Sequence, residues 1–199
     1  MAYDYHIVLG ASSVLLGLLG YAIYFRSIFY GKTKPHVLTW STYFLIDTIV
    51  FLAQVLKGAG PGAWGTLTGA VGGLFVSIIA LRRGERYITK LDWTSFIGAL
   101  FAIVLWQATS NPFVAVVIAT IINVFAIFPT LRKSYDNPFE ESISIWLLDL
   151  IRYGISIIAL VAVNWTTVLF PIGLVATNAI LVSTILIRRH ILARNADNI

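Results

Sequence analysis

Seven stretches of the chain, about 16 to 23 residues long, contain almost no charged residues. Roughly 20 apolar residues in an α-helix are needed to cross the hydrocarbon core of a bilayer. The composition agrees, since 58% of the residues are hydrophobic and only 12% are charged, against about 25% charged in soluble domains. The sequence therefore predicts an all-α polytopic membrane protein. Its seven expected transmembrane helices are residues 7–25, 37–56, 62–81, 93–108, 113–131, 142–163 and 165–187.

Positively charged residues are distributed unevenly among the segments that connect these spans. Of the fourteen Lys and Arg residues, twelve follow the first, third or fifth span or lie in the C-terminal tail, whereas Lys57 lies on the opposite side and Arg152 inside a span. An excess of Lys and Arg marks the cytoplasmic loops of membrane proteins. We therefore expect an external N-terminus and a cytoplasmic C-terminus in a plasma (inner) membrane. The asymmetry explains the net charge of +5 without a nucleic-acid partner; a weaker alternative is that the basic loops bind anionic lipid.

Several kinds of chemistry are excluded or unsupported by the sequence. The chain has no cysteine, which excludes disulfides and thiolate metal sites. His6, His36 and His190 lie near span ends without the spacing of metal ligands. The sequence contains neither a phosphate-binding loop nor a nucleophile elbow. We therefore expect no metal, no cofactor and no enzymatic activity.

Three pairs of similar features recur in the same order in the two halves of the chain. Residues 25–35 and 128–138 both run from a phenylalanine to a proline over the same length. Asp47 and Asp149 follow these prolines by twelve and eleven residues. The third and seventh spans end with the similar sequences VSIIALRR (76–83) and VSTILIRR (182–189). This collinear order indicates an internal duplication.

The duplication predicts two parallel repeats. Residues 1–90 are expected to form the first three-helix repeat, residues 91–110 a linker helix, and residues 111–199 the second three-helix repeat with a short cytoplasmic tail. Because the linker crosses the membrane once, both repeats have the same orientation and are related by an axis along the membrane normal. In transporters of this design, the substrate site lies near the bilayer midplane between the repeats.

This arrangement resembles the SWEET and PQ-loop superfamily of sugar, amino-acid and related small-solute transporters. The resemblance covers nearly the whole chain: seven spans in a three-plus-one-plus-three order, an external N-terminus, and a proline-marked loop after the first helix of each repeat, at Pro35 and Pro138. The family's Pro-Gln dipeptide is not retained, since Thr130 follows Pro129. The resemblance implies transport of a small solute. It also implies a solute-binding asparagine on the third helix of a repeat, which Asn178 matches in the second repeat.

Three charged residues are predicted to lie inside spans: Asp47 in the second, and Asp149 and Arg152 in the sixth. A charge at the centre of a spanning helix costs about 2.5–3.5 kcal/mol on insertion scales, so such residues usually serve a function. Arg152 follows Asp149 by three residues, a spacing that permits an ion pair. We hypothesise that Asp149 stays ionised beside Arg152 and that Asp47 binds a proton or a cationic group. The alternative is that Arg152 pairs with both carboxylates and only joins the two helices.

Aromatic and polar side chains share helix faces with these charges. Tyr43 lies on the same face as Asp47, and Trp146 and Tyr153 lie with Asp149 and Arg152. In the fifth and seventh spans, asparagines add neutral groups that either contact a ligand or bond between helices. This mixture is typical of a small-solute pocket. The candidate substrate-binding or coupling residues are Asp47, Asp149, Arg152, Asn178, Asn123, Trp146, Tyr43 and Tyr153.

Gly65, Gly69 and Gly73 recur at every fourth residue of the third span. Small residues at this spacing let helices approach one another closely. We interpret the series as a packing surface within the first repeat.

These features predict a facilitator or proton-coupled secondary transporter of a small polar solute such as a sugar, amino acid or vitamin, acting by alternating access at the midplane site. The expected partners are membrane lipid and the solute, and assembly into a homo-oligomer stays open. One alternative is a seven-helix receptor or sensor that binds a ligand without moving it. A minor alternative is an intramembrane aspartyl protease, in which two carboxylates share a proton, although neither aspartate has that family's Gly-x-Gly-Asp context.

Overall fold

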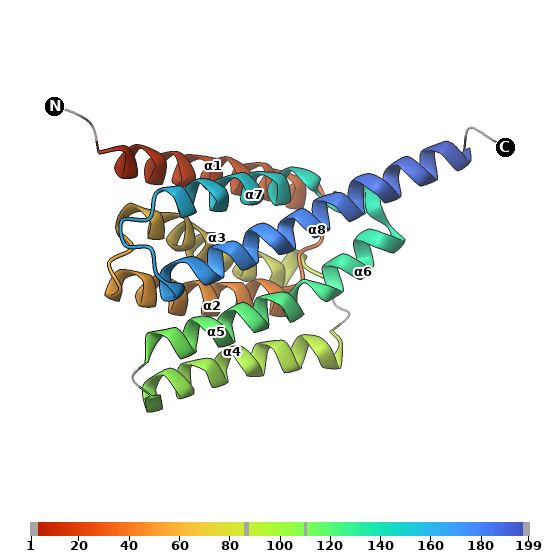
Figure 1. Cartoon of the computed structure of the whole chain (residues 1–199). Helices are drawn as coiled ribbons and strands as arrows, with labels where there is room; N and C mark the ends of the chain where they lie inside the picture. The colour runs from red at the N-terminus through yellow and green to blue at the C-terminus, as the bar shows by residue number, and fades with distance from the viewer. Residues whose placement is uncertain (1–3, 86–87, 110, 197–199) are drawn as a thin grey trace.

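The computed structural model describes residues 4–85, 88–109 and 111–196, and most of this length is helical (Figure 1). In chain order the elements are α1 (Tyr5–Phe29), α2 (Val37–Leu56), the 3-10 helix η1 (Gly60–Ala63), α3 (Trp64–Arg83), α4 (Lys90–Thr109), α5 (Pro112–Ala126), α6 (Phe128–Asp136), the 3-10 helix η2 (Pro138–Glu140), α7 (Ile143–Ile158) and α8 (Trp165–Ala196). Within these residues no β-strand forms, and His36 and Glu85 make an isolated bridge. The predicted all-α class is therefore confirmed.

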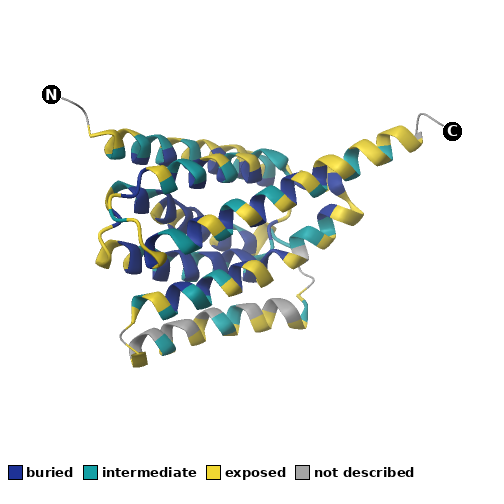
Figure 2. Cartoon of the chain, in the orientation of Figure 1, coloured by how far each residue is buried: buried dark blue, intermediate teal, exposed yellow. Residues whose placement is uncertain are grey.

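Within the described residues, five helical stretches are long and apolar enough to cross a membrane: Tyr5–Phe29, Val37–Leu56, Gly60–Arg83, Pro112–Asp136 and Trp165–Asn195. Large apolar side chains lie on the outside, for example Leu15 on α1 and Ile180 on α8, which are 67% and 57% exposed. Figure 2 shows the buried residues on the inner sides of the helices and exposed residues on their outer sides. An extended apolar exterior suits contact with hydrocarbon, as expected of an integral membrane protein.

The sixth predicted span differs from the structure at its C-terminal end. α7 contains 16 residues and ends at Ile158, whereas the apolar run predicted a helix to residue 163. The backbone N–H groups of Val161 and Ala162 donate to the carbonyl oxygens of Ala59 and Gly58 over 3.1 and 3.2 Å. Bonds to another segment thus replace those that would continue the helix, so the helical prediction for this end is wrong.

The fifth predicted span is also interrupted. α5 ends at Ala126 and α6 begins at Phe128, with Pro129 in the first turn of α6. Proline is tolerated in a first turn because its missing N–H would have no partner within the helix. The break therefore falls where the sequence places a proline inside an apolar run.

The helices pack in two groups of three, with α4 at one side of the bundle (Figure 1). In one group α3 packs against α1 and α2, and in the other α8 packs against α5 and α7. The groups meet where α1 packs against α7 and where α2 packs against α5. α4 packs against α5 and α2. Each of these contacts, apart from those of α4, has a counterpart in the other group.

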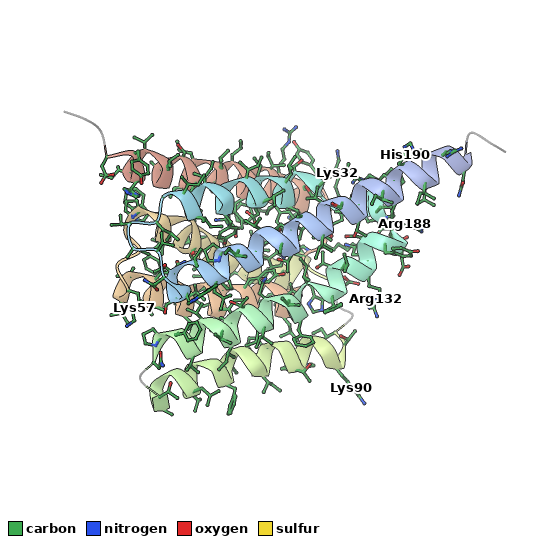
Figure 3. The ribbon with its side chains drawn as sticks, in the orientation of Figure 1. Lys32, Lys57, Lys90, Arg132, Arg188 and His190 are labelled. Carbon is green, nitrogen blue, oxygen red and sulfur yellow. The ribbon has the colours of Figure 1, made fainter. Side chains whose placement is uncertain are left out.

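Basic side chains gather at one end of the bundle, which we call the basic end. Figure 3 shows Lys32, Lys90, Arg132 and Arg188 at this end and Lys57 at the opposite end. α8 also projects beyond the other helices at the basic end (Figure 1), because its 32 residues extend about 48 Å. The uneven charge distribution of the sequence is therefore an asymmetry between the two ends of the bundle. Arg86, which belongs to the same set of basic residues, lies outside the described residues.

Candidate functional site

One cavity inside the bundle brings together all eight candidate residues from the sequence. We call it the central cavity, and α1, α2, α5, α7 and α8 contribute to its wall. Its lining consists of Tyr21, Trp40, Tyr43, Asp47, Asn123, Ile127, Trp146, Asp149, Arg152, Tyr153, Leu174, Thr177 and Asn178. Because these helices belong to both groups of three, the central cavity lies at the junction of the two groups.

Arg152 organises the charged part of this cavity, and its side chain is only 1% exposed. Its Nε donates to Oδ1 of Asp149 over 2.5 Å, as the three-residue spacing predicts. Its Nη1 donates to the backbone oxygen of Gly65 over 2.6 Å, and its Nη2 to the hydroxyl of Tyr153 over 2.9 Å. The guanidinium carbon also lies 4.1 Å from the centre of the Tyr153 ring. Arg152 therefore joins α7 to α3 and leaves Asp149 with a close positive partner.

Asp47 has a different environment from Asp149. It is 5% exposed, and within the described residues it forms no ion pair and no side-chain hydrogen bond; the ion pair of Arg152 is with Asp149. The alternative that Arg152 pairs with both carboxylates is therefore not what the contacts show. The Asp47 carboxylate and the Tyr153 hydroxyl both lie against Gly69. A carboxylate without a cationic partner thus faces the cavity.

The glycine series on α3 lies against both groups of helices, so the interpretation that it packs only within the first repeat is wrong. A methyl group at Gly65 would contact the hydroxyls of Ser13 on α1 and Ser156 on α7, which are hydrogen-bonded to each other over 2.7 Å. A methyl group at Gly69 would meet Asp47 and Tyr153. The four-residue spacing indicates close approach but carries no information about which helix approaches.

The two asparagines donate to groups of the protein itself. Asn123 Nδ2 donates to the hydroxyl of Thr177 over 3.3 Å, and Asn178 Nδ2 donates to the backbone oxygen of Leu174 over 2.8 Å. Within the described residues, the buried Oδ1 of Asn178 has no hydrogen-bond partner. Buried polar atoms usually have one. Together with Asp47, this oxygen gives the cavity acceptors without a hydrogen-bond partner among the described residues, whereas each nitrogen of the Arg152 guanidinium already donates to a protein oxygen.

Aromatic rings cover the cavity toward the basic end. Trp40 of α2 and Trp146 of α7 are stacked, with ring centres 6.4 Å apart and planes 26° apart. Tyr43 meets Trp40 edge-on at 5.8 Å. Trp40 of α2 and Tyr21 of α1 also line the cavity but are not among the eight candidates. Trp40 lies three residues before Tyr43, a spacing that places the two on one helix face, whereas Tyr21 is one of three aromatic residues in the first span, with Tyr24 and Phe25, and nothing in its spacing distinguishes it.

The central cavity is closed around its lining. The space open to the centres of water molecules is about 20 Å³, and a buried water needs roughly 10–15 Å³ by this measure. This conformation therefore has room for about one water molecule. A larger solute requires the helices to separate.

The fold and this cavity define an all-helical protein, with five helical stretches among the described residues long and apolar enough to cross a membrane, and with a buried, polar, aromatic-lined site at the junction of two three-helix groups. Comparisons of the chain with family models, with curated proteins and with solved structures found no match. Among the described residues, no three His, Asp or Glu side chains gather in a way that could hold a metal ion. A functional assignment therefore depends on the geometry of the site.

Proposed function

We propose that the protein is a membrane transporter, either a facilitator or a proton-coupled secondary transporter, that binds a small polar solute in the central cavity. The observation that carries this proposal is Asp47, a buried carboxylate that forms no ion pair with any of the described residues and lies in a cavity between two groups of helices. An unpaired charge is costly inside a membrane protein and is retained where it binds or moves something.

The proposed architecture is two parallel three-helix repeats joined by α4. The corresponding packing of α1, α3 and α2 in one group and of α5, α8 and α7 in the other supports it. With the basic end in the cytoplasm, as the positive-inside rule requires, the N-terminus is external and the membrane is a plasma or inner membrane. Alternating access then consists of motion of one group against the other around the central cavity.

The chemistry of the cavity supports a solute that donates hydrogen bonds or carries a positive charge. Asp149 is paired with Arg152, so Asp47 leaves a net charge of about −1 unless it binds a proton. The unpartnered Oδ1 of Asn178 adds an acceptor. The aromatic rings provide apolar surface and can stabilise a cation. Sugars, amino acids and amine-bearing vitamins fit these requirements, whereas an anion would meet Asp47 without a free positive partner.

The test begins with thermal stabilisation of the purified protein by sugars, amino acids, vitamins and nucleosides, because a ligand raises the unfolding temperature of the state that binds it. Uptake of each stabilising compound into proteoliposomes is then measured with and without a pH gradient. Wild-type protein is expected to take up at least one stabilising compound, and Asp47→Asn to lose this uptake or its response to the gradient. Asp136→Asn, which changes an exposed aspartate of α6, is the matched control. Binding without uptake or counterflow under any gradient overturns the proposal in favour of a receptor or sensor.

The contacts of Asp149 do not favour an aspartyl protease. Proteolysis by two aspartates requires both carboxyl groups to share a proton and activate one water. Asp149 accepts a hydrogen bond from Arg152 at 2.5 Å, a contact that stabilises its ionised form.

A further inference from the structure

A second cavity lies between the central cavity and the basic end. Its open space is about 80 Å³, and its lining includes Lys34, Arg132, Lys133 and Glu141. We call it the basic-end cavity. Of the described residues, only Trp40 and Trp146 line both cavities. The two stacked indoles are therefore the partition between them.

The partition is made from both groups of helices. Trp40 belongs to α2 and Trp146 to α7, and each is 5% exposed. Their stacking distance of 6.4 Å is within the range of favourable aromatic pairs, which contribute about 0.5–1.5 kcal/mol beyond their burial. Motion of one group against the other would separate the two rings and join the cavities.

Trp146 is also held by a buried carboxylate outside the spans. Its Nε1 donates to Oε1 of Glu141 over 3.2 Å, and Oε2 of Glu141 lies 3.6 Å from Nζ of Lys133 on α6. Glu141 is only 6% exposed, and Arg189 of α8 donates to its backbone oxygen over 2.9 Å. Both carboxylate oxygens of Glu141 therefore have partners: Oε1 accepts a hydrogen bond from the indole of Trp146, and Oε2 forms an ion pair with Lys133.

We propose that Trp40 and Trp146 form a gate between the central cavity and the basic end, and that Glu141 is a positioning residue that holds this gate closed through Trp146 and Lys133. The inference rests on the proposed function in one respect, since the gate controls access to the same solute site. Loss of either Glu141 contact frees the indole of Trp146 to leave the stack.

The protonation state of Glu141 then makes the gate sensitive to the pH at the basic end. Burial raises the pKa of the Glu141 carboxyl, although the Lys133 charge and the Trp146 hydrogen bond act in the opposite direction. Protonation removes the ion pair with Lys133 and weakens the bond from Trp146, because a neutral carboxyl is a poorer acceptor than a carboxylate. The other charged or titratable groups around it are Arg189 of α8, Tyr24 of α1, and, in the wall of the basic-end cavity, Lys34, His36, Glu85 and Arg132. Acidification at the basic end is therefore expected to favour the open gate.

The absence of cysteine from the chain allows a single reporter thiol. Leu174→Cys places it in the wall of the central cavity. The probe is the membrane-impermeant cation 2-(trimethylammonium)ethyl methanethiosulfonate, applied to the basic end in vesicles of known orientation. At about pH 7.5, Glu141→Gln and Lys133→Gln are expected to raise the labelling rate roughly three- to tenfold, the effect of losing one charge-assisted contact from a closed state. Glu141→Gln removes a negative charge and so lowers the local concentration of the cationic probe, which means that faster labelling of this variant reports opening. Lys133→Gln removes a positive charge from the same cavity and raises that concentration, so its faster labelling supports the gate only when Glu141→Gln also labels faster.

Glu140→Gln is the matched control, because Glu140 is exposed and adjacent in sequence. The labelling rate of the otherwise unchanged reporter protein, divided by that of Glu141→Gln at the same pH, is expected to rise as the pH falls from about 7.5 to about 5.5, a range above the ordinary carboxyl pKa. Taking this ratio cancels the loss of reactive thiolate at low pH, and the same ratio for Glu140→Gln should rise equally. Trp146→Phe, which keeps a ring but loses the N–H, should label as fast as Glu141→Gln. Equal rates in Glu141→Gln, Lys133→Gln, Trp146→Phe and the control would overturn the gate.

The two proposals fail separately in this experiment. Labelling reports access to the cavity whether or not a solute is moved. Gated labelling in a protein that transports nothing supports the gate and removes the transport proposal. Solute uptake with labelling that ignores Glu141, Lys133 and Trp146 supports transport and removes the gate.

Discussion

Nε of Arg152 lies 2.5 Å from Oδ1 of Asp149, so this carboxylate of the central cavity is paired from within its own helix. Asp47 of α2 lines the same cavity and forms no ion pair within the part of the chain that the structure describes. The two aspartates therefore have different environments. Asp149 belongs to the hydrogen-bond network of Arg152, and under the proposed function Asp47 is the carboxylate that binds a proton or the solute.

The pairing predicts strong coupling between Asp149 and Arg152. Arg152→Met leaves a buried carboxylate without its cation and is expected to destabilise the protein by about 3–5 kcal/mol. Asp149→Asn combined with Arg152→Met removes both charges, so the double variant should lose clearly less free energy of unfolding than Arg152→Met alone. Unfolding of the three proteins by heat or denaturant in the same detergent measures the difference. A single variant as stable as wild type would mean that the pair contributes little to the fold.

Asp47→Asn is expected to separate function from stability. Because this carboxylate lacks an ion pair within the described residues, replacing its charge should leave the unfolding temperature unchanged or higher. Solute uptake or its dependence on a pH gradient should be lost. Asp149→Asn should instead lower the unfolding temperature, since it removes the partner of Arg152. If Asp47→Asn and Asp149→Asn behave alike in both assays, the division of roles between the two residues is wrong.

The sequence predicted those features that depend on local spacing. Apolar runs predicted the helices because each span must satisfy its own backbone hydrogen bonds in lipid, and the i, i+3 spacing predicted the ion pair of Asp149 and Arg152. The end of α7 was not predictable in this way. Val161 and Ala162 are as apolar as the preceding helix, and their N–H groups bond to Ala59 and Gly58 from a distant part of the chain.

Contacts between distant segments also explain the rest of the site that the sequence did not reveal. Nothing local to Gly69 indicates that Asp47 and Tyr153 converge on it. The stacking of Trp40 on Trp146, which are far apart in sequence, likewise depends on how α2 and α7 pack. A list of polar and aromatic residues inside the spans identified most of the lining, but not the partition or the unequal pairing of the carboxylates.

Gly69→Ala tests the close approach of α3 to the site. The added methyl group would meet the Asp47 carboxylate and the Tyr153 hydroxyl, and overpacking of this kind costs about 1–3 kcal/mol. Solute uptake is expected to fall, because the added methyl group displaces the Asp47 carboxylate. Gly154→Ala is the matched control, because a methyl group there has no neighbour within 4 Å and a glycine-to-alanine change in a helix stabilises by about 0.4–1 kcal/mol. Thermal unfolding and uptake of both variants are measured together, and equal behaviour would contradict the assigned environment of Gly69.

The buried Glu141 predicts a pH dependence of stability with a defined sign. Burial raises the folded-state pKa of this carboxyl above its ordinary value of 4.5. A raised folded-state pKa contributes stability that is complete below the unfolded-state pKa and is lost as the pH rises through the folded-state pKa. The unfolding temperature of wild type relative to Glu141→Gln should therefore fall as the pH rises above the ordinary carboxyl pKa and through the raised folded-state pKa of Glu141. Glu140→Gln, at an exposed position, should show no such trend relative to wild type. A difference between wild type and Glu141→Gln that grows with pH would mean that the contacts with Lys133 and Trp146 outweigh burial. The expected sign would instead mean that an ionised Glu141 lowers the stability of the fold, the kind of trade-off between stability and function that is common at functional sites.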